Sequence, residues 1–109
     1  MMGAKVLTAN EQLVMLAISR CGRQAYALAI QDEIRQHGHT LTLGVLYTVL
    51  ARLERQQLIY HRDGDATPER GDRAKRFYAL NGAGARELRD ALRLLDSLRA
   101  GAYAPKGAQ

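Results

Sequence analysis

The sequence predicts a mainly helical fold that carries one small two-stranded β-ribbon. Apolar residues repeat at intervals of three and four in the first half of the chain, and the period changes to two over residues 58–80. A last helical pattern follows the ribbon. The chain has 109 residues, which suits one domain. The expected order of elements is therefore helix, helix, helix, strand, strand, helix.

The first helix is expected over residues 8–20. Thr8 is a good N-cap, and Glu11 follows at the spacing of a capping box, in which each side chain binds the other residue's backbone N–H. Gly22 is a natural helix end. The expected apolar stripe consists of Leu13, Leu16 and Ala17 with Arg20 at its end, widened by Val14 and Ile18.

Two further helices are expected over residues 25–36 and 43–56. Gly38 ends the first of them, and Thr42 is the expected N-cap of the second. The buried faces are expected to consist of Ala27, Ile30 and Ile34 in one helix and of Leu46, Val49, Leu50 and Leu53 in the other.

The period-two region predicts strands over residues 58–62 and 74–80, joined by a loop rich in glycine and acidic residues. Because side chains alternate along a strand, Arg76, Tyr78 and Leu80 should share one face, opposite Lys75, Phe77 and Ala79. Asn81 is expected to cap the last helix, over residues 83–100. We expect a domain over residues 1–81, a pairing helix over 82–101 and a flexible tail over 102–109.

Three short helices followed by a ribbon is the layout of a winged helix-turn-helix. In that layout the third helix enters the major groove of DNA, and the ribbon loop, or wing, reaches the adjacent backbone or minor groove. The formal charge of +5 is spread evenly along the chain. Residues 1–51 contain four basic and three acidic residues, residues 52–80 contain seven and five, and residues 81–109 contain five and three. The position of the cations therefore matters more than their number. The basic residues expected on the wing are Arg70, Arg73, Lys75 and Arg76.

The third helix carries further candidates for DNA binding on the side opposite its apolar stripe. Thr42 and the first-turn amides can donate to phosphate, helped by the helix dipole. Gly44 lets the backbone approach the duplex closely. Thr48 and Arg52 lie one turn apart and are expected to meet base edges or phosphates. The same side also presents Tyr47, Ala51 and Arg55.

The sequence resembles the PadR family of bacterial transcriptional regulators in three segments. Residues 43–55, LGVLYTVLARLER, match the family's Gly, Leu-Tyr and Leu-Glu positions, and 75–80, KRFYAL, match its basic, hydrophobic, Tyr and Leu positions before a closing glycine. Residues 25–30 give a weaker match. The resemblance implies a homodimeric repressor that binds double-stranded DNA, and a phosphate contact from Tyr47. Some members respond to small aromatic or hydrophobic effectors, but this chain has no Trp to stack a flat ligand.

Three positions depart from the family pattern. Gln57 stands where the family commonly has Gly, so we expect a non-glycine residue in a left-handed conformation at some energetic cost. Ala25 replaces Gly, and Asn81 replaces Thr; both Asn and Thr cap helices well.

The last helix is the expected dimerisation element, because a domain this small leaves its apolar stripe uncovered and the resemblance implies pairing there. A dimer would place two recognition helices about 34 Å apart, as a palindromic operator requires. An effector that binds one dimer state better would release the operator. The expected pairing residues are Leu88, Ala91, Leu92, Leu95 and Leu98, with Leu94 beside them and with Leu7, Val14 and Ile18 opposite.

Two other functions remain open: a winged-helix module that binds only proteins, and a small metal or redox sensor using His37, His39 and Cys21. A stable metal site usually needs three or four ligands, and His61 is the only other histidine. No phosphate loop, catalytic triad or carboxylate pair stands out, so neither enzymatic activity nor a cofactor is expected. A single cysteine and apolar runs too short to span a bilayer favour a cytoplasmic protein.

Overall fold

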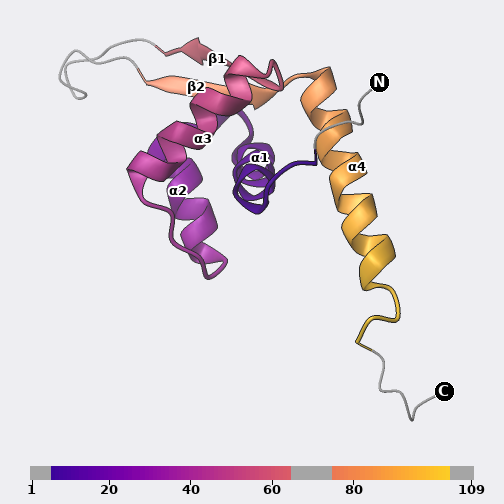
Figure 1. Ribbon diagram of the computed structural model, residues 1–109. Coiled ribbons are helices and arrows are strands. Elements are labelled where there is room, and N and C mark those ends of the chain that lie inside the picture. The colour runs from indigo at the N-terminus through magenta and orange to yellow at the C-terminus, as the bar shows by residue number, and fades with distance from the viewer. Residues whose placement is uncertain (1–5, 65–74, 104–109) are drawn as a thin grey trace.

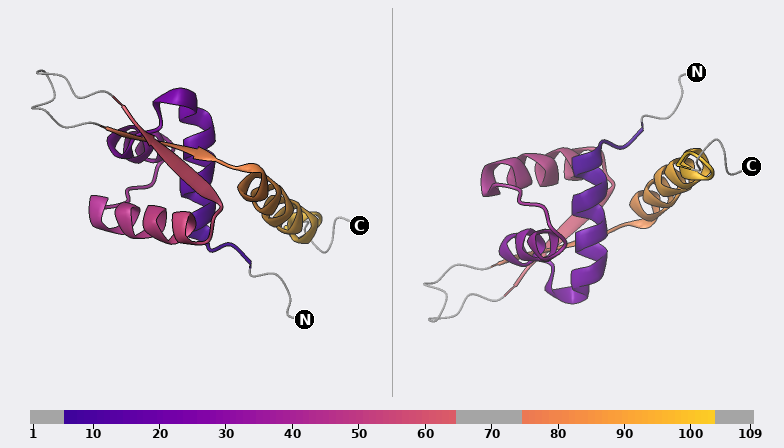
Figure 2. Two further views of the ribbon diagram at one scale, coloured as in Figure 1. Left: turned by 90° about the horizontal axis from the view of Figure 1, so that it is seen from above. Right: turned by 90° about the horizontal axis from the view of Figure 1, so that it is seen from below.

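The computed structural model describes residues 6–64 and 75–103. In this part of the chain three helices form a cluster, a two-stranded ribbon lies along it, and a fourth helix leaves it beyond α1 (Figures 1 and 2). This arrangement confirms the predicted winged helix-turn-helix fold. The elements are α1 (Ala9–Cys21), the 3-10 turn η1 (Gly22–Gln24), α2 (Ala27–Gln36), α3 (Leu43–Arg55), β1 (Ile59–Asp63), β2 (Arg76–Leu80) and α4 (Gly82–Arg99).

Each predicted element is present, with bounds that differ from the expected ones by one or two residues. The second helix starts later than predicted because the residues before it pair with the ribbon. The backbone N–H of Tyr78 donates to the carbonyl of Ala25 at 2.8 Å, which keeps Ala25 outside α2. Ala25 is fully buried there, so a small side chain fits between the helices and the ribbon.

The helix ends follow the local signals in the sequence. Thr8 and Glu11 form the predicted capping box, with N–H to oxygen distances of 2.8 and 3.1 Å. The Thr42 hydroxyl accepts from the Val45 N–H at 3.2 Å. Gln57 has a φ of 61°, so the expected left-handed conformation is confirmed.

The core lies between α1, α2, α3 and the inner face of the ribbon. Its largest apolar side chains, each at most 2% exposed, are Met15, Ile30, Leu46, Leu50, Leu53 and Ile59. Because α1 contacts α2, α3, α4 and β2, more of its circumference is buried than in a surface helix.

Two expectations about α1 are wrong. Leu16, expected in the buried stripe, is 37% exposed. The expected dimer surface of Leu7, Val14 and Ile18 lies in the core of the same chain, with exposed fractions of 5%, 0% and 2%. The reason is the central position of α1: the neighbours of the same chain already cover these side chains.

The ribbon is antiparallel, and its register pairs Ile59 with Leu80 and Asp63 with Arg76. Tyr78 is buried on the inner face, as the predicted alternation requires. The end of the ribbon that carries Asp63 and Arg76 is tied to the start of α2 by two rings with a cation on each. The Arg62 guanidinium lies 4.6 Å from the Phe77 ring centre, and the Lys75 ammonium lies 3.9 Å from that of Tyr26. The two rings meet edge to face at 5.9 Å.

Candidate nucleic-acid interface

The exposed side of α3 begins at its first turn. Thr42, Gly44, Tyr47 and Thr48 are all exposed there, and the apolar stripe on the other side is buried. A Cβ atom at Gly44 would have no neighbour within 4 Å, so this backbone is open to a close approach. The Thr48 hydroxyl donates to the Gly44 carbonyl at 2.9 Å, which orients its methyl and oxygen on the helix surface. Tyr47 is 53% exposed. The structure thus brings these four candidates together on one surface.

Sequence reasoning missed two apolar members of this surface. Leu43 and Val45 are 37% and 41% exposed, although both stand in the most apolar part of the helix. The sequence could have indicated their exposure, because both lie outside the buried repeat of Leu46, Val49 and Leu50. Exposed aliphatic groups at the start of a recognition helix are suited to contact the thymine methyl group in a major groove.

Arg52 differs from the other α3 candidates because it has a partner inside the protein. Its Nε donates to Glu11 Oε2 at 3.0 Å, and its side chain is 35% exposed. The Glu11 side chain is completely buried, and its other oxygen accepts from the Thr8 N–H at 2.8 Å. Glu11, which completes the capping box of α1, therefore also binds α3. Sequence reasoning assigned Arg52 to DNA and did not foresee this link, because 41 residues separate the partners.

The wing supplies cations at its base. Arg76 is exposed, whereas Lys75 is half-buried and its ammonium lies over the ring of Tyr26 at the start of α2. The other two wing candidates, Arg70 and Arg73, lie outside the described residues. Arg62, which sequence reasoning passed over, is also exposed, and its Nη2 donates to the Arg23 carbonyl at 3.1 Å.

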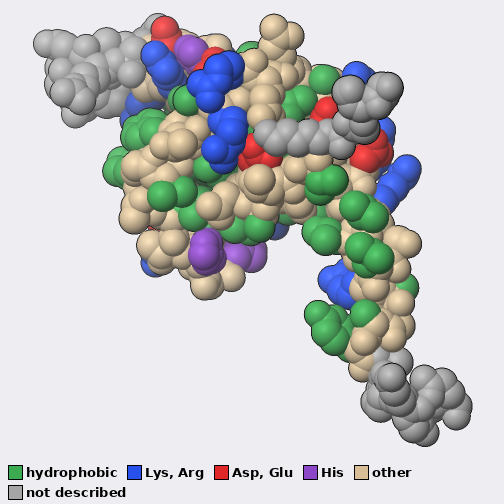
Figure 3. Space-filling view, in the orientation of Figure 1, with side chains coloured by type: hydrophobic (Ala, Val, Ile, Leu, Met, Phe, Trp, Pro, Cys, Tyr) green, Lys and Arg blue, Asp and Glu red, His purple; other side chains and the backbone are tan. Residues whose placement is uncertain are grey.

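The pairing residues expected on α4 divide into two groups. Leu88 and Ala91 are 6% and 8% exposed because they pack on the core of the same chain, so their assignment to a dimer interface is corrected. Leu92 is partly buried against the same core. Leu95 and Leu98 are 49% and 68% exposed, and Leu94 is 46% exposed. Figure 3 shows hydrophobic side chains gathered along this free end of the helix.

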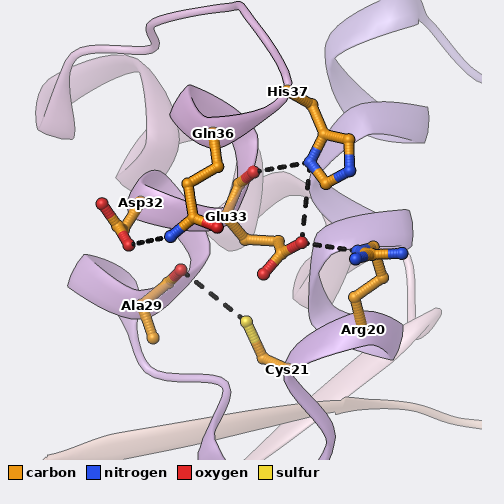
Figure 4. A network of polar contacts seen from close by, with 7 residues as sticks. All are labelled: Arg20, Cys21, Ala29, Asp32, Glu33, Gln36 and His37. Atoms are coloured by element: carbon orange, nitrogen blue, oxygen red, sulfur yellow. Dashed lines mark hydrogen bonds and ion pairs between the residues drawn. The ribbon is translucent and has the colours of Figure 1, made fainter.

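The residues of the metal or redox alternative do not converge. Figure 4 shows the His37 ring beside Glu33, which also binds Arg20, whereas the Cys21 thiol points to the Ala29 carbonyl at 3.7 Å. Across residues 6–64 and 75–103 no three histidine, cysteine or acidic side chains lie close enough to hold a metal ion. His61 lies against Glu54 instead and links the end of α3 to β1.

We expect Cys21 to react slowly with iodoacetamide at pH 8. Burial raises the pKa of the Cys21 thiol, the nearby Glu33 carboxylate raises it further, and Arg20 only partly opposes them. A raised pKa leaves less thiolate, which is the reactive form. The alkylation rate of the folded protein, compared with that in guanidinium chloride, tests this. Equal rates in the two solutions would contradict the expectation.

A sequence model described as the transcriptional regulator PadR-like family matches residues 15–90, which include α2, α3, the ribbon and the first half of α4. The chain belongs to this family. The PadR-like protein is accordingly a transcriptional regulator and not an enzyme. The comparison with curated proteins gives no match.

Solved structures with the same fold agree with this membership. A PadR family transcriptional regulator from Eggerthella lenta DSM 2243 is 28% identical to the PadR-like chain, with a TM-score of 0.69 over 84% of this chain and 79% of that one. A complex structure of hsRosR-S1 is 27% identical, with a TM-score of 0.65 over 84% and 74%. A PadR-like transcription factor from Bacteroides fragilis shares the fold at 23% identity, with a TM-score of 0.71 over 84% of each chain. Among the described helices of the PadR-like chain, none has the length and apolar character needed to cross a membrane.

Proposed function

We propose that this PadR-like protein binds operator DNA as a homodimer and represses transcription until an effector releases it. The observation that carries the proposal is the exposed first half of α3, where an open backbone, two hydroxyl residues and Tyr47 lie on one surface. Such a surface fits a major groove, and Lys75 and Arg76, at the start of β2, are suited to bind the adjacent phosphates.

The expected contacts with DNA are of two kinds, to phosphates and to base edges. Tyr47, Lys75 and Arg76 would bind phosphates and set the register of the protein on the duplex. Thr48 and Val45 would meet base edges, since they lie on the exposed side of the recognition helix. Arg52 would support DNA binding indirectly, by holding α3 in position. Any direct contact with DNA would come from guanidinium nitrogens other than the Nε that binds Glu11.

Selection of binding sites from random DNA by the purified protein tests the proposal directly. We expect a palindromic site and an affinity that falls steeply with salt. Arg76→Ala should lower the slope of log K against log salt by about one, because one phosphate contact is lost. A protein that selects no sequence even at low salt would refute DNA binding and favour the protein-binding module.

Tyr47→Phe should weaken operator binding about tenfold, because it removes the hydroxyl that would bind a phosphate and keeps the ring. Tyr60→Phe is a matched control. Tyr60 is also 53% exposed, but it lies on the ribbon face that borders Ile18 and Gly22 of α1 and η1. Gel-shift titrations of both variants make the comparison. Equal affinities for the two variants would show that Tyr47 does not contact DNA.

Dimerisation is proposed through the free end of α4. Leu98→Glu should convert a dimer into a monomer, because it places a charge among the exposed leucines. Ser97→Glu is the control, since on an α-helix residue 97 lies on the side opposite Leu88 and Leu95. Size-exclusion chromatography with light scattering measures both. A wild-type monomer at micromolar concentration, or a dimer in Leu98→Glu, would overturn this interface.

Repression and release follow from the proposed dimer. A dimer on an operator that overlaps a promoter would block access to that promoter. An effector can release it only if it binds one arrangement of the dimer more tightly than the other. Transcription in vitro from the selected site, with and without the protein, tests the sign of regulation.

A further inference from the structure

The two turns that flank the ribbon meet at one residue. The ribbon register pairs Ile59 with Leu80, so the turn that follows α3 and the start of α4 lie at the same end of the ribbon. Asn81 stands between them. Its backbone N–H donates to the Leu58 carbonyl at 3.1 Å, and its side-chain Nδ2 donates to the Gln57 carbonyl at 2.7 Å. Its Oδ1 accepts from the Gly84 N–H, also at 2.7 Å.

The turn after α3 needs such support. Gln57 N–H donates to the Glu54 carbonyl at 2.9 Å, and Leu58 N–H donates to the Leu53 carbonyl at 3.0 Å. This is the Schellman pattern of a helix end, in which glycine usually occupies the left-handed position. Here Gln57 occupies it with a φ of 61°, in a region that side chains disfavour. The Asn81 amide binds the carbonyl of that same strained residue.

The same junction also holds α4. Only Gly84, Leu88 and Ala91 of α4 are buried, and every residue from 93 onward in the helix is exposed. A helix of 18 residues is roughly 27 Å long, so a tilt of about 10° at its base would move its far end by roughly 5 Å. That shift exceeds the rise of one base pair, about 3.4 Å. Small changes at the junction would therefore alter the spacing between two recognition helices.

We propose that Asn81 is a positioning residue whose bridge between the Gln57 turn and the first turn of α4 fixes the angle at which α4 leaves the winged domain. The inference rests on the proposed function in one respect: α4 must pair two copies on DNA for this angle to set the half-site spacing. An amide suits the task because it has a donor and an acceptor at separate atoms. A hydroxyl can still cap α4, but it is too short to hold both partners.

Asn81→Ser separates the two roles, because serine is as good an N-cap as asparagine but cannot span the junction. The experiment measures binding to palindromes whose half-sites are moved apart or together by one base pair. We expect the wild type to prefer one spacing. Asn81→Ser should remain a dimer by light scattering and keep its affinity for a single half-site. Its preference for the best spacing should fall roughly fivefold, the effect of one lost hydrogen bond.

Rescue distinguishes positioning from a general loss of stability. Gln57→Gly in the Asn81→Ser background should recover stability, because glycine holds a left-handed turn without strain, but it should not restore the spacing preference, because the bridge to α4 is still missing. An unchanged spacing preference in Asn81→Ser, or a spacing preference that returns together with stability in the double variant, would overturn the proposal.

A second readout does not depend on DNA. Spin labels at Ala51 and Ser97, both exposed, report the distance from α3 to α4. Cys21 is replaced by serine so that it is not labelled, and labelled chains are diluted with unlabelled ones so that only distances within one chain are measured. The distance distribution should be narrow in the wild type and broader in Asn81→Ser. If the wild type binds no DNA, the proposed function fails while this measurement still tests the bridge; equal distributions would refute the bridge itself.

Discussion

Gly84→Ala is expected to destabilise the protein by about 3 kcal/mol, at the upper end of the usual cost of overpacking a core. A Cβ atom at this position would lie 2.0 Å from the Leu58 carbonyl oxygen and 2.9 Å from its carbon. These are backbone atoms, and the oxygen already accepts from the Asn81 N–H, so they cannot move aside without breaking the junction. The loss is a large fraction of the 5–15 kcal/mol that stabilises a typical domain.

Gly82→Ala is the matched control for this change. Gly82 lies in the same first turn of α4, but the only atom within 4 Å of a Cβ there is the flexible end of Arg86, at 3.6 Å. Alanine should therefore be neutral or slightly stabilising at Gly82, since it favours the helix over glycine. Thermal and urea unfolding followed by circular dichroism measure both variants. Equal stabilities would mean that α4 does not rest on the backbone of Leu58.

Arg52→Ala is also expected to cost about 3 kcal/mol, because it removes the guanidinium that binds the fully buried Glu11 carboxylate. The value is at the low end of the range for such changes, since the Thr8 N–H still donates to Glu11. Arg55→Ala, one turn further along α3 and exposed, should change stability by less than about 0.5 kcal/mol.

A second substitution locates the origin of this loss. Glu11→Gln in the Arg52→Ala background should recover part of the stability, because burying a neutral amide costs less than burying a carboxylate that has lost the Arg52 guanidinium. The double-mutant cycle is measured by urea unfolding. If Arg52→Ala is no less stable than Arg55→Ala, the buried pair does not hold α3. Any loss of DNA affinity in Arg52→Ala has to be measured where the variant is still folded.

The local elements could be predicted because their signals are local. The capping box of Thr8 and Glu11, the repeat of Leu46, Val49, Leu50 and Leu53, and the alternation around Tyr78 each depend on neighbours within a few residues. The left-handed Gln57 could be predicted as well, from the glycine that the resembled family commonly has at this position. These signals, with the family resemblance, were sufficient for the fold and for the family to which the chain belongs.

The site could be predicted less completely, because its details depend on partners far away in the chain. Periodicity showed that α3 has a polar side and placed Arg52 on it, so Arg52 was predicted to contact DNA. In the fold its Nε donates to Glu11 instead. Likewise, a leucine stripe on α4 looks uniform in sequence. The fold buries Leu88 against the core and leaves Leu98 exposed, because α4 extends beyond the body that covers its first half.

By itself, the sequence determined the order of helices and strands, most of their caps and the apolar stripe of α3. Only the tertiary structure decided which polar and apolar side chains remain available to a partner. It also showed that Gln57 and Asn81, two separate departures from the family pattern, are joined by a hydrogen bond of 2.7 Å. The physical reason is that caps and periodicity act over one or two turns, whereas burial and pairing depend on which distant segments the core brings together.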